Sequence, residues 1–142
     1  MTSGSFEYAL QAAGIVTVLI GIGHTAFHRI FGWKRAFASI SVHNAKVFIT
    51  IHIGSTIFLF LVGALTLHYS ALLSQSTEPA SVLCVSLSLF WSWRLLWQLT
   101  YFKPSPIKHD TRFLVMHYAF TLSFAFLVAA YGAPVAARLW SA

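Results

Sequence analysis

Histidine is the residue type in this sequence that offers the most chemistry. The chain has seven histidines and only three acidic residues among its 142 residues. His24 and His28 are four residues apart in an apolar stretch, so both lie on one face of a predicted helix. Neutral imidazole nitrogens are common ligands of transition metals. We therefore expect a metal ion or a heme iron to be held by members of this set: His24, His28, His52, His109 and His117.

Three of these histidines fall at similar distances from the ends of their predicted helices. His24 precedes the end of the first apolar segment by about seven residues, and His52 follows the start of the second by about eight. His117 lies about five residues into the fourth segment. With a rise of about 1.5 Å per residue, all three lie roughly 8–12 Å from the same end of the helices. This pattern predicts a shared site; ordinary helix–helix hydrogen bonds by each histidine are the alternative.

The third apolar segment places a cation at the same level. Arg94 and Gln98 are four residues apart and share a helix face. No acidic residue lies within the predicted helices at that level, and ionisable groups in a membrane usually point toward a partner or water. We expect Arg94 to meet a bound anion, a lipid or quinone head group, a heme propionate or another subunit. Snorkelling to the lipid phosphates is the alternative.

A b-type heme would use these residues in a defined way. Heme iron takes one or two axial histidines, and four-helix bundles hold such cofactors between their helices. His24 or His28 would supply one ligand, and His52 or His117 the other. A single His-coordinated transition metal is equally compatible, because imidazole binds iron, copper and zinc alike. The predicted cofactor-binding residues are Arg94, Gln98, Trp93 and Trp97, with Lys46 or Arg112 at the propionates and Phe48 and Phe113 along the slot.

The residues leave three classes of function open. The first is a membrane-embedded redox protein, for electron transfer or as a lipid- or quinone-linked oxidoreductase. The second is a non-catalytic small subunit of a larger membrane complex or homo-oligomer. The third is a metal-free enzyme that uses histidine and arginine for acid–base chemistry on a lipophilic substrate. Carboxylate-bridged di-iron chemistry is excluded, because Glu7 and Glu78 fall at the opposite end and only Asp110 remains.

The composition indicates whether water or lipid surrounds the chain. Hydrophobic residues make up 58% of the chain and charged residues 8%, whereas a soluble domain carries about 25% charged residues. A chain so poor in charge cannot cover a water-facing surface, so membrane lipid is its predicted surroundings. The net charge of +6 comes from cations that flank apolar segments. It therefore reports membrane orientation and not binding to nucleic acid.

Four apolar segments are long enough to cross a bilayer, which takes roughly 20 residues each. They span residues 6–31, 44–73, 80–102 and 112–140. The connections between them are short, which favours antiparallel neighbours. The sequence therefore predicts an all-α integral membrane protein with one domain, residues 1–142, folded as an up-down-up-down four-helix transmembrane bundle.

The positions of the basic residues predict how this bundle is oriented across the membrane. Seven of them lie in or beside the first and third connections: Arg29, Lys34, Arg35, Lys46, Lys103, Lys108 and Arg112. At the other end only Arg138 is basic. Because cytoplasmic loops are enriched in Lys and Arg, both termini are predicted to lie on the non-cytoplasmic side. We expect the histidines and Arg94 at the cytoplasmic end, in a bacterial inner membrane or its equivalent.

Glycines mark the first two segments. Gly14 and Gly21 on the first, with Gly54 and Gly63 on the second, favour a close approach of these helices. Their spacings differ from the four residues of the GxxxG motif. Ordinary use of glycine in membrane helices therefore explains them as well.

Overall fold

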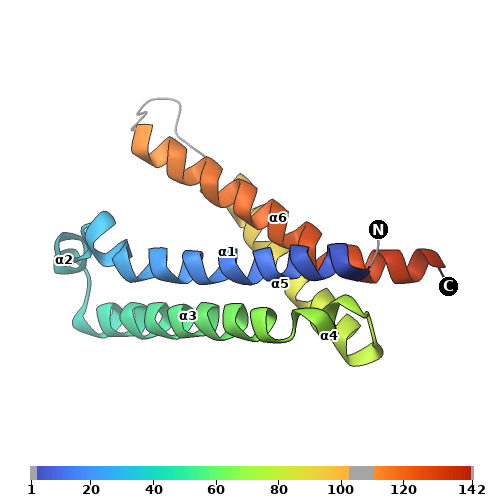
Figure 1. Cartoon of the computed structure of the whole chain (residues 1–142). Coiled ribbons are helices and arrows are strands. Elements are labelled where there is room, and N and C mark those ends of the chain that lie inside the picture. Colours follow the sequence, from blue (N-terminus) through green and yellow to red (C-terminus); the bar gives the residue numbers. More distant parts are fainter. Residues whose placement is uncertain (1–2, 103–110, 142) are drawn as a thin grey trace. The chain divides into compact units, whose positions relative to one another are not determined.

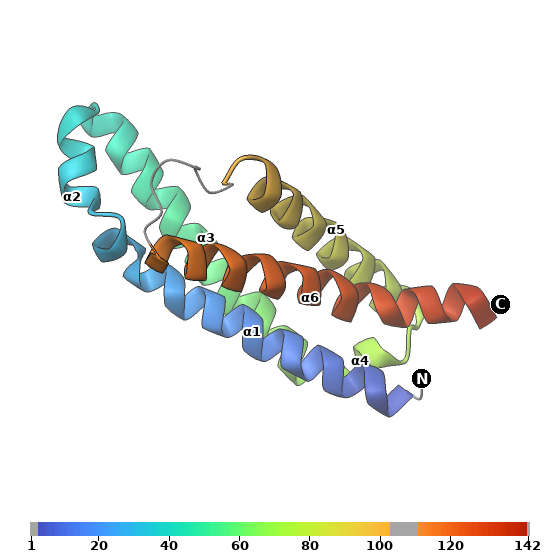
Figure 2. The same ribbon diagram turned by 90° about the horizontal axis from the view of Figure 1, so that it is seen from above.

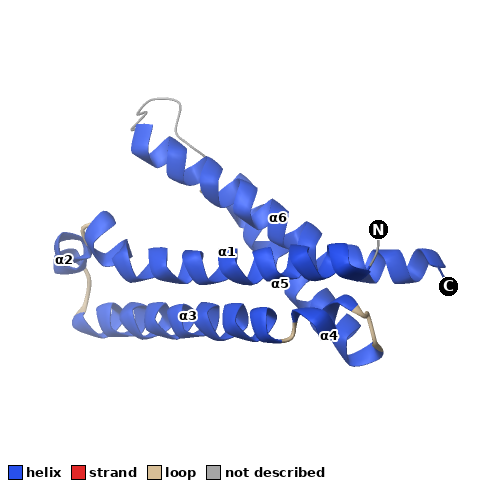
Figure 3. Ribbon diagram, in the orientation of Figure 1, coloured by secondary structure: helices blue, strands red, loops and turns tan. Residues whose placement is uncertain are grey.

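Helices account for nearly all of the described chain. The computed structural model describes residues 3–102 and 111–141 (Figures 1 and 3). The structure contains four long helices, of which the first three are joined by short helical turns. They are α1 (Ser3–Ile30), α3 (Val42–His68), α5 (Glu78–Thr100) and α6 (Thr111–Ser141), with α2 (Trp33–Ala36), the 3-10 turn η1 (Phe37–Ser39) and α4 (Ser70–Ser74) between them.

Each of the four long helices is long and apolar enough to cross a membrane. In lipid no water is present to bind exposed backbone groups, so a spanning segment must satisfy its N–H and C=O groups internally, as a helix does. Large apolar side chains such as Ile51, Leu61, Val82 and Leu122 are exposed on these helices. The chain is a multi-pass integral membrane protein, as its composition predicts.

The second helix is shorter than its apolar run. The predicted segment 44–73 is broken at Tyr69, so that α3 ends at His68 and a separate turn of helix, α4, begins at Ser70. Composition could not locate this break, because the apolar run continues past His68 and Ser70 to Leu73. The first connection also differs from a plain loop: Gly32 adopts a left-handed conformation with φ of 59° and starts α2. A left-handed φ is higher in conformational free energy for a residue with a side chain than for glycine, so glycine suits this position.

The described helices fall into two compact units, which are considered separately. The first unit, residues Gly14–His68, contains most of α1 and all of α3 and is called the α1–α3 hairpin (Figure 2). Its helices are antiparallel, because Gly14 lies against Gly63 near one end and His24 stacks on His52 near the other. A Cβ built at Gly63 would lie 2.6 Å from Cγ2 of Val18. The expected close approach is therefore confirmed for Gly14 and Gly63.

The second unit combines Met1–Ala13 with Tyr69–Ala142 and is called the α5–α6 hairpin after its main helices. Among the hydrogen bonds that join α5 and the turn before it to α6, three occur in an order that makes the helices antiparallel. They are Ser76 Oγ to Pro134 O, Ser88 Oγ to Val128 O, and Gln98 Nε2 to His117 Nδ1. Trp91, Leu127 and Tyr131 are fully buried in this unit.

Four membrane-length helices thus agree with the predicted fold class. The antiparallel order within each hairpin agrees with the short connections. The full up-down-up-down order and the position of both termini away from the cytoplasm stay predictions. The third connection, including His109 and Asp110, lies outside the described residues.

Candidate functional site

The central polar pair of the α5–α6 hairpin is Gln98 and His117. Nε2 of Gln98 lies 2.9 Å from Nδ1 of His117, and the two side chains are only 7% and 6% exposed. In this arrangement the amide N–H donates to Nδ1, so the neutral imidazole carries its proton on Nε2. The hydrogen bond therefore fixes both the tautomer and the orientation of the ring.

Arg94 lies one turn before Gln98 on the same face of α5, as its spacing predicts. Its guanidinium carbon is 5.3 Å from the centre of the Phe124 ring and 5.6 Å from that of Trp93. Contacts of this kind with aromatic faces contribute about 0.5–2 kcal/mol. Within the described part of the chain, no carboxylate pairs with this half-buried cation.

Trp91 lies one turn before Arg94 on α5 and adds another hydrogen-bond donor. The side chain is 1% exposed and stacks on Phe124 with ring centres 5.6 Å apart. Its indole Nε1–H is buried and has no hydrogen-bond partner among the described residues. A buried polar group left unsatisfied costs about 1–3 kcal/mol. The simplest explanation for a buried donor without a partner is that a bound ligand supplies the acceptor.

These residues lie along the contact between α5 and α6, and we treat them together as one candidate site, the α5–α6 polar site: Trp91, Arg94, Gln98 and His117, with Phe124 as its apolar wall. Its free hydrogen-bonding capacity consists mainly of donors, namely the indole N–H, the guanidinium N–H groups and the imidazole Nε2–H. Such a set suits a ligand that presents acceptor oxygens. The arrangement is compatible with a carbonyl, a phenolate or an acid group on a lipophilic body.

Three residues of this candidate site were also named from the sequence. Arg94, Gln98 and His117 were predicted from their level in the membrane, and Gln98 and His117 are now joined by a hydrogen bond. Trp91 and Phe124 were not predicted as site residues. A usable signal existed for Phe124, which follows His117 by seven residues, or two helical turns, and therefore shares its face.

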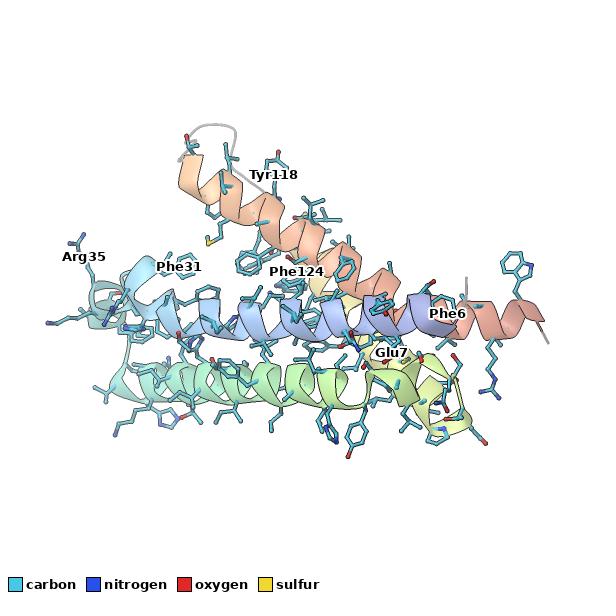
Figure 4. All side chains as sticks on the ribbon, in the orientation of Figure 1. Phe6, Glu7, Phe31, Arg35, Tyr118 and Phe124 are labelled. Carbon is cyan, nitrogen blue, oxygen red and sulfur yellow. The ribbon has the colours of Figure 1, made fainter. Side chains whose placement is uncertain are left out.

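The two tryptophans predicted to line a cofactor slot lie mainly on the outer face of α5. Trp93 is 51% exposed and Trp97 is 40% exposed, and their rings lie 6.1 Å apart. Trp97 also stacks on Tyr101, with ring centres 5.2 Å apart. Tyr118, next to His117 on α6, points away from the helices in Figure 4 and is 60% exposed. Only Trp93 approaches the polar site, through its contact with Arg94.

The α1–α3 hairpin holds a second group of histidines. The rings of His24 and His52 are stacked, with centres 5.5 Å apart and planes inclined by 12°. Nε2 of His52 donates to the backbone carbonyl of His24 at 3.0 Å, and Nδ1 of His24 donates to the carbonyl of Ile20 at 3.1 Å. Trp33 covers His52 edge-on at 4.5 Å. His52 therefore joins the two helices directly through the backbone of α1.

The predicted metal ligands are distributed over both hairpins. His28 is exposed on α1, and its Nδ1 donates to the carbonyl of Thr25 at 2.9 Å. His24, His28 and His52 belong to one hairpin and His117 to the other, while His109 lies outside the described residues. In the described ranges, no three His, Cys, Asp or Glu side chains are grouped as a metal site. The shared histidine site therefore stays a prediction.

Comparison with known proteins gives no match to a family model, a curated protein sequence or a solved structure.

Proposed function

We propose that this membrane protein binds the head group of a quinone, or of a similar lipophilic acceptor, at the α5–α6 polar site and serves a quinone-linked redox reaction. The observation that carries the proposal is the buried, unsatisfied indole N–H of Trp91 beside Arg94, which has no carboxylate partner in the described part of the chain. A quinone supplies what the site lacks, because it combines carbonyl acceptors with a flat apolar ring. Phe124, which packs against Trp91 and Arg94, would form part of the apolar surroundings of that ring.

The polar groups would have distinct tasks during quinone reduction. Negative charge develops on the quinone oxygens when an external electron donor reduces the quinone, and preorganised donors stabilise such charge best in a dry site. Arg94 would stabilise the developing oxyanion. His117 would donate a hydrogen bond from its Nε2–H to the quinone, since Gln98 holds the ring with Nδ1 as the acceptor.

A direct test measures quinone binding by the full chain in mild detergent. Titration with a short-chain benzoquinone should quench tryptophan fluorescence with a saturable component. Arg94→Gln and His117→Leu should each weaken binding about tenfold or more, which corresponds to loss of one hydrogen bond to a charged or buried group. Arg35→Gln and His43→Leu are matched controls, because both residues are exposed outside this hairpin and should leave affinity unchanged.

Other outcomes would overturn the proposal. Quenching that is linear in quinone and equal in all variants would indicate simple partitioning into the micelle. Saturable binding that survives both Arg94→Gln and His117→Leu would place the ligand elsewhere. Circular dichroism of each variant separates a loss of binding from a loss of fold.

A His-ligated redox centre is the second candidate, and the orientation of His24 and His28 favours it. Each ring donates its Nδ1–H to a backbone carbonyl of its own helix, which is how metal-binding histidines are commonly held. These two residues suit a small transition-metal ion. A heme with His24 and His52 as its two axial ligands fits poorly, because these rings stack directly on each other and leave no room for a macrocycle between them.

Metal analysis and a visible spectrum of protein purified in mild detergent test this second candidate. Stoichiometric metal that is lost in His24→Ala and in His28→Ala, and retained in His68→Ala, would support it. A spectrum without a Soret band, together with metal below one equivalent, would rule it out.

A further inference from the structure

The connection between α1 and α2 forms an open hollow that is rich in positive charge. Its volume is about 600 Å³. It is lined by Arg29, Ile30, Phe31, Gly32, Lys34 and Arg35. Figure 4 labels Phe31 and Arg35 at this connection, with Arg35 directed away from the helices. We call this feature the α1–α2 hollow.

The backbone gathers these cations within a short stretch of chain. Arg29 belongs to the last turn of α1, whereas Lys34 and Arg35 belong to α2. Gly32 turns the chain between them with its left-handed φ of 59°, and its carbonyl accepts the N–H of Arg35 at 2.9 Å. The turn thereby brings cations from two helices to one concave surface.

The positive charge of the hollow has no counter-charge within the α1–α3 hairpin itself. The three acidic residues of the chain are Glu7, Glu78 and Asp110, and none belongs to the α1–α3 hairpin. Three neighbouring cations that repel one another favour an anion from outside the hairpin.

The other lining residues indicate what kind of anion. Ile30 is 57% exposed and Phe31 is 46% exposed, so an apolar rim adjoins the cations. The hollow also lies at the end of a membrane-length helix, where phospholipid phosphates and the first methylene groups of the acyl chains are found. A free phosphate ion would use the cations alone. A phospholipid would use both the cations and the apolar rim.

The neighbouring ring cluster holds the connection in place. Trp33, which follows Gly32, packs edge-on against Phe48 at 4.8 Å and against His52 at 4.5 Å. Phe37 packs against Phe48 at 5.4 Å. These contacts anchor α2 on α3, so the backbone that carries Lys34 and Arg35 is positioned before any ligand binds and less ordering is needed on binding.

We propose that the α1–α2 hollow is a binding site for an anionic phospholipid, with Arg29, Lys34 and Arg35 on the phosphate and with Ile30 and Phe31 beside the acyl chains. The site is independent of the α5–α6 polar site. Such a site would make the protein select anionic phospholipids. A general enrichment of cations in cytoplasmic loops would not by itself produce this selectivity.

Native mass spectrometry of the full chain in mild detergent tests this proposal. Phosphatidylglycerol and phosphatidylcholine of the same chain length are added in competition, and the retained lipid is counted. The wild-type chain should retain phosphatidylglycerol selectively. The triple variant Arg29→Gln/Lys34→Gln/Arg35→Gln should lose about fivefold in affinity for each cation removed, or about a hundredfold in total.

The matched control is Lys46→Gln/Lys103→Gln/Lys108→Gln, which removes equal charge from the same predicted side of the membrane. It should retain phosphatidylglycerol within about threefold of the wild type. Equal losses in both triple variants would overturn the proposal, because general surface charge would then explain lipid retention. Retention of phosphatidylcholine equal to that of phosphatidylglycerol would also overturn it.

Two further measurements complete the test. Inorganic phosphate at millimolar concentration should not displace the lipid; full displacement would identify a free-phosphate site and overturn the lipid assignment. Ile30→Ser/Phe31→Ser keeps every cation and should weaken lipid retention severalfold without changing the helix content measured by circular dichroism. Unchanged retention in this variant would contradict a role for the apolar rim.

Discussion

Gln98 and His117 are joined by a 2.9 Å hydrogen bond between two buried side chains on neighbouring antiparallel helices. In an apolar core, a polar pair of this kind is stabilising only while both partners are present, because a lone buried polar group is costly. The bond also leaves Nε2 of His117 as the proton-bearing nitrogen. The Gln98–His117 pair is therefore both a structural contact between α5 and α6 and the chemical centre of the α5–α6 polar site.

The first prediction concerns the coupling between these residues. Gln98→Ala and His117→Ala should each destabilise the protein, and the double variant should be less destabilised than the sum of the two. The coupling energy should be about 0.5–1.5 kcal/mol, as for a typical hydrogen bond within a protein. Unfolding of the wild type and these three variants in detergent measures it. Additive effects would show that the bond contributes nothing to stability.

The second prediction separates ligand binding from stability at Trp91. Trp91→Phe removes the unsatisfied N–H and keeps an aromatic ring against Phe124. Without a ligand, the thermal midpoint should stay the same or rise, since the variant no longer buries an unpaired donor. Quinone affinity, measured by equilibrium dialysis, should fall by about tenfold. A lower midpoint with unchanged affinity would assign Trp91 to packing alone.

The third prediction concerns the crossing of α1 and α3. A Cβ at Gly63 would lie 2.6 Å from Val18 Cγ2 and 3.0 Å from the carbonyl oxygen of Gly14. Gly63→Ala should therefore destabilise the protein by about 1–3 kcal/mol, as overpacking does. Gly54→Ala is the control, because nothing lies within 4 Å of its Cβ position. It should be neutral or stabilising, and equal effects at the two glycines would contradict a close crossing.

The fourth prediction concerns the turn before α5. Ser76 is a non-glycine residue with φ of 52°, and its buried Oγ donates to the carbonyl of Pro134 at 3.0 Å. Ser76→Ala should cost about 1 kcal/mol through loss of this bond. Ser86→Ala is the matched control, since the exposed Ser86 Oγ bonds only to Val82 in its own helix. Thermal unfolding should distinguish the two; equal midpoints would indicate that the bond to Pro134 is unimportant.

The fifth prediction addresses His52. His52→Phe keeps a ring in the cluster but loses the bond to the carbonyl of His24, so it should cost about 0.6 kcal/mol, the average for such bonds between membrane helices. His52→Ala should cost more, since it also removes the contacts with Trp33 and His24. Comparison of the two midpoints checks this order. A larger loss in His52→Phe would indicate a role for the imidazole beyond these contacts.

Periodicity and composition alone established much about this protein. Four long apolar stretches with few charges specify membrane-spanning helices, because only a helix satisfies the backbone of a lone segment in lipid. The spacing of Arg94 and Gln98 specifies a shared face, because helix geometry is regular. The glycines of the first two segments were compatible with a close crossing, but only the structure separates Gly63, which is closely packed, from Gly54, which has open space around it.

Tertiary structure decided the contacts between helices. Sequence spacing describes one helix at a time, whereas the partner of a side chain depends on how the neighbouring helix is rotated and how the two helices cross. For this reason the orphan N–H of Trp91, the Gln98–His117 bond and the bond from His52 to the backbone of His24 could not be predicted from apolar sequences without a marked helical stripe. The break at Tyr69 was hidden for a similar reason, because an apolar run looks the same whether its helix continues or turns.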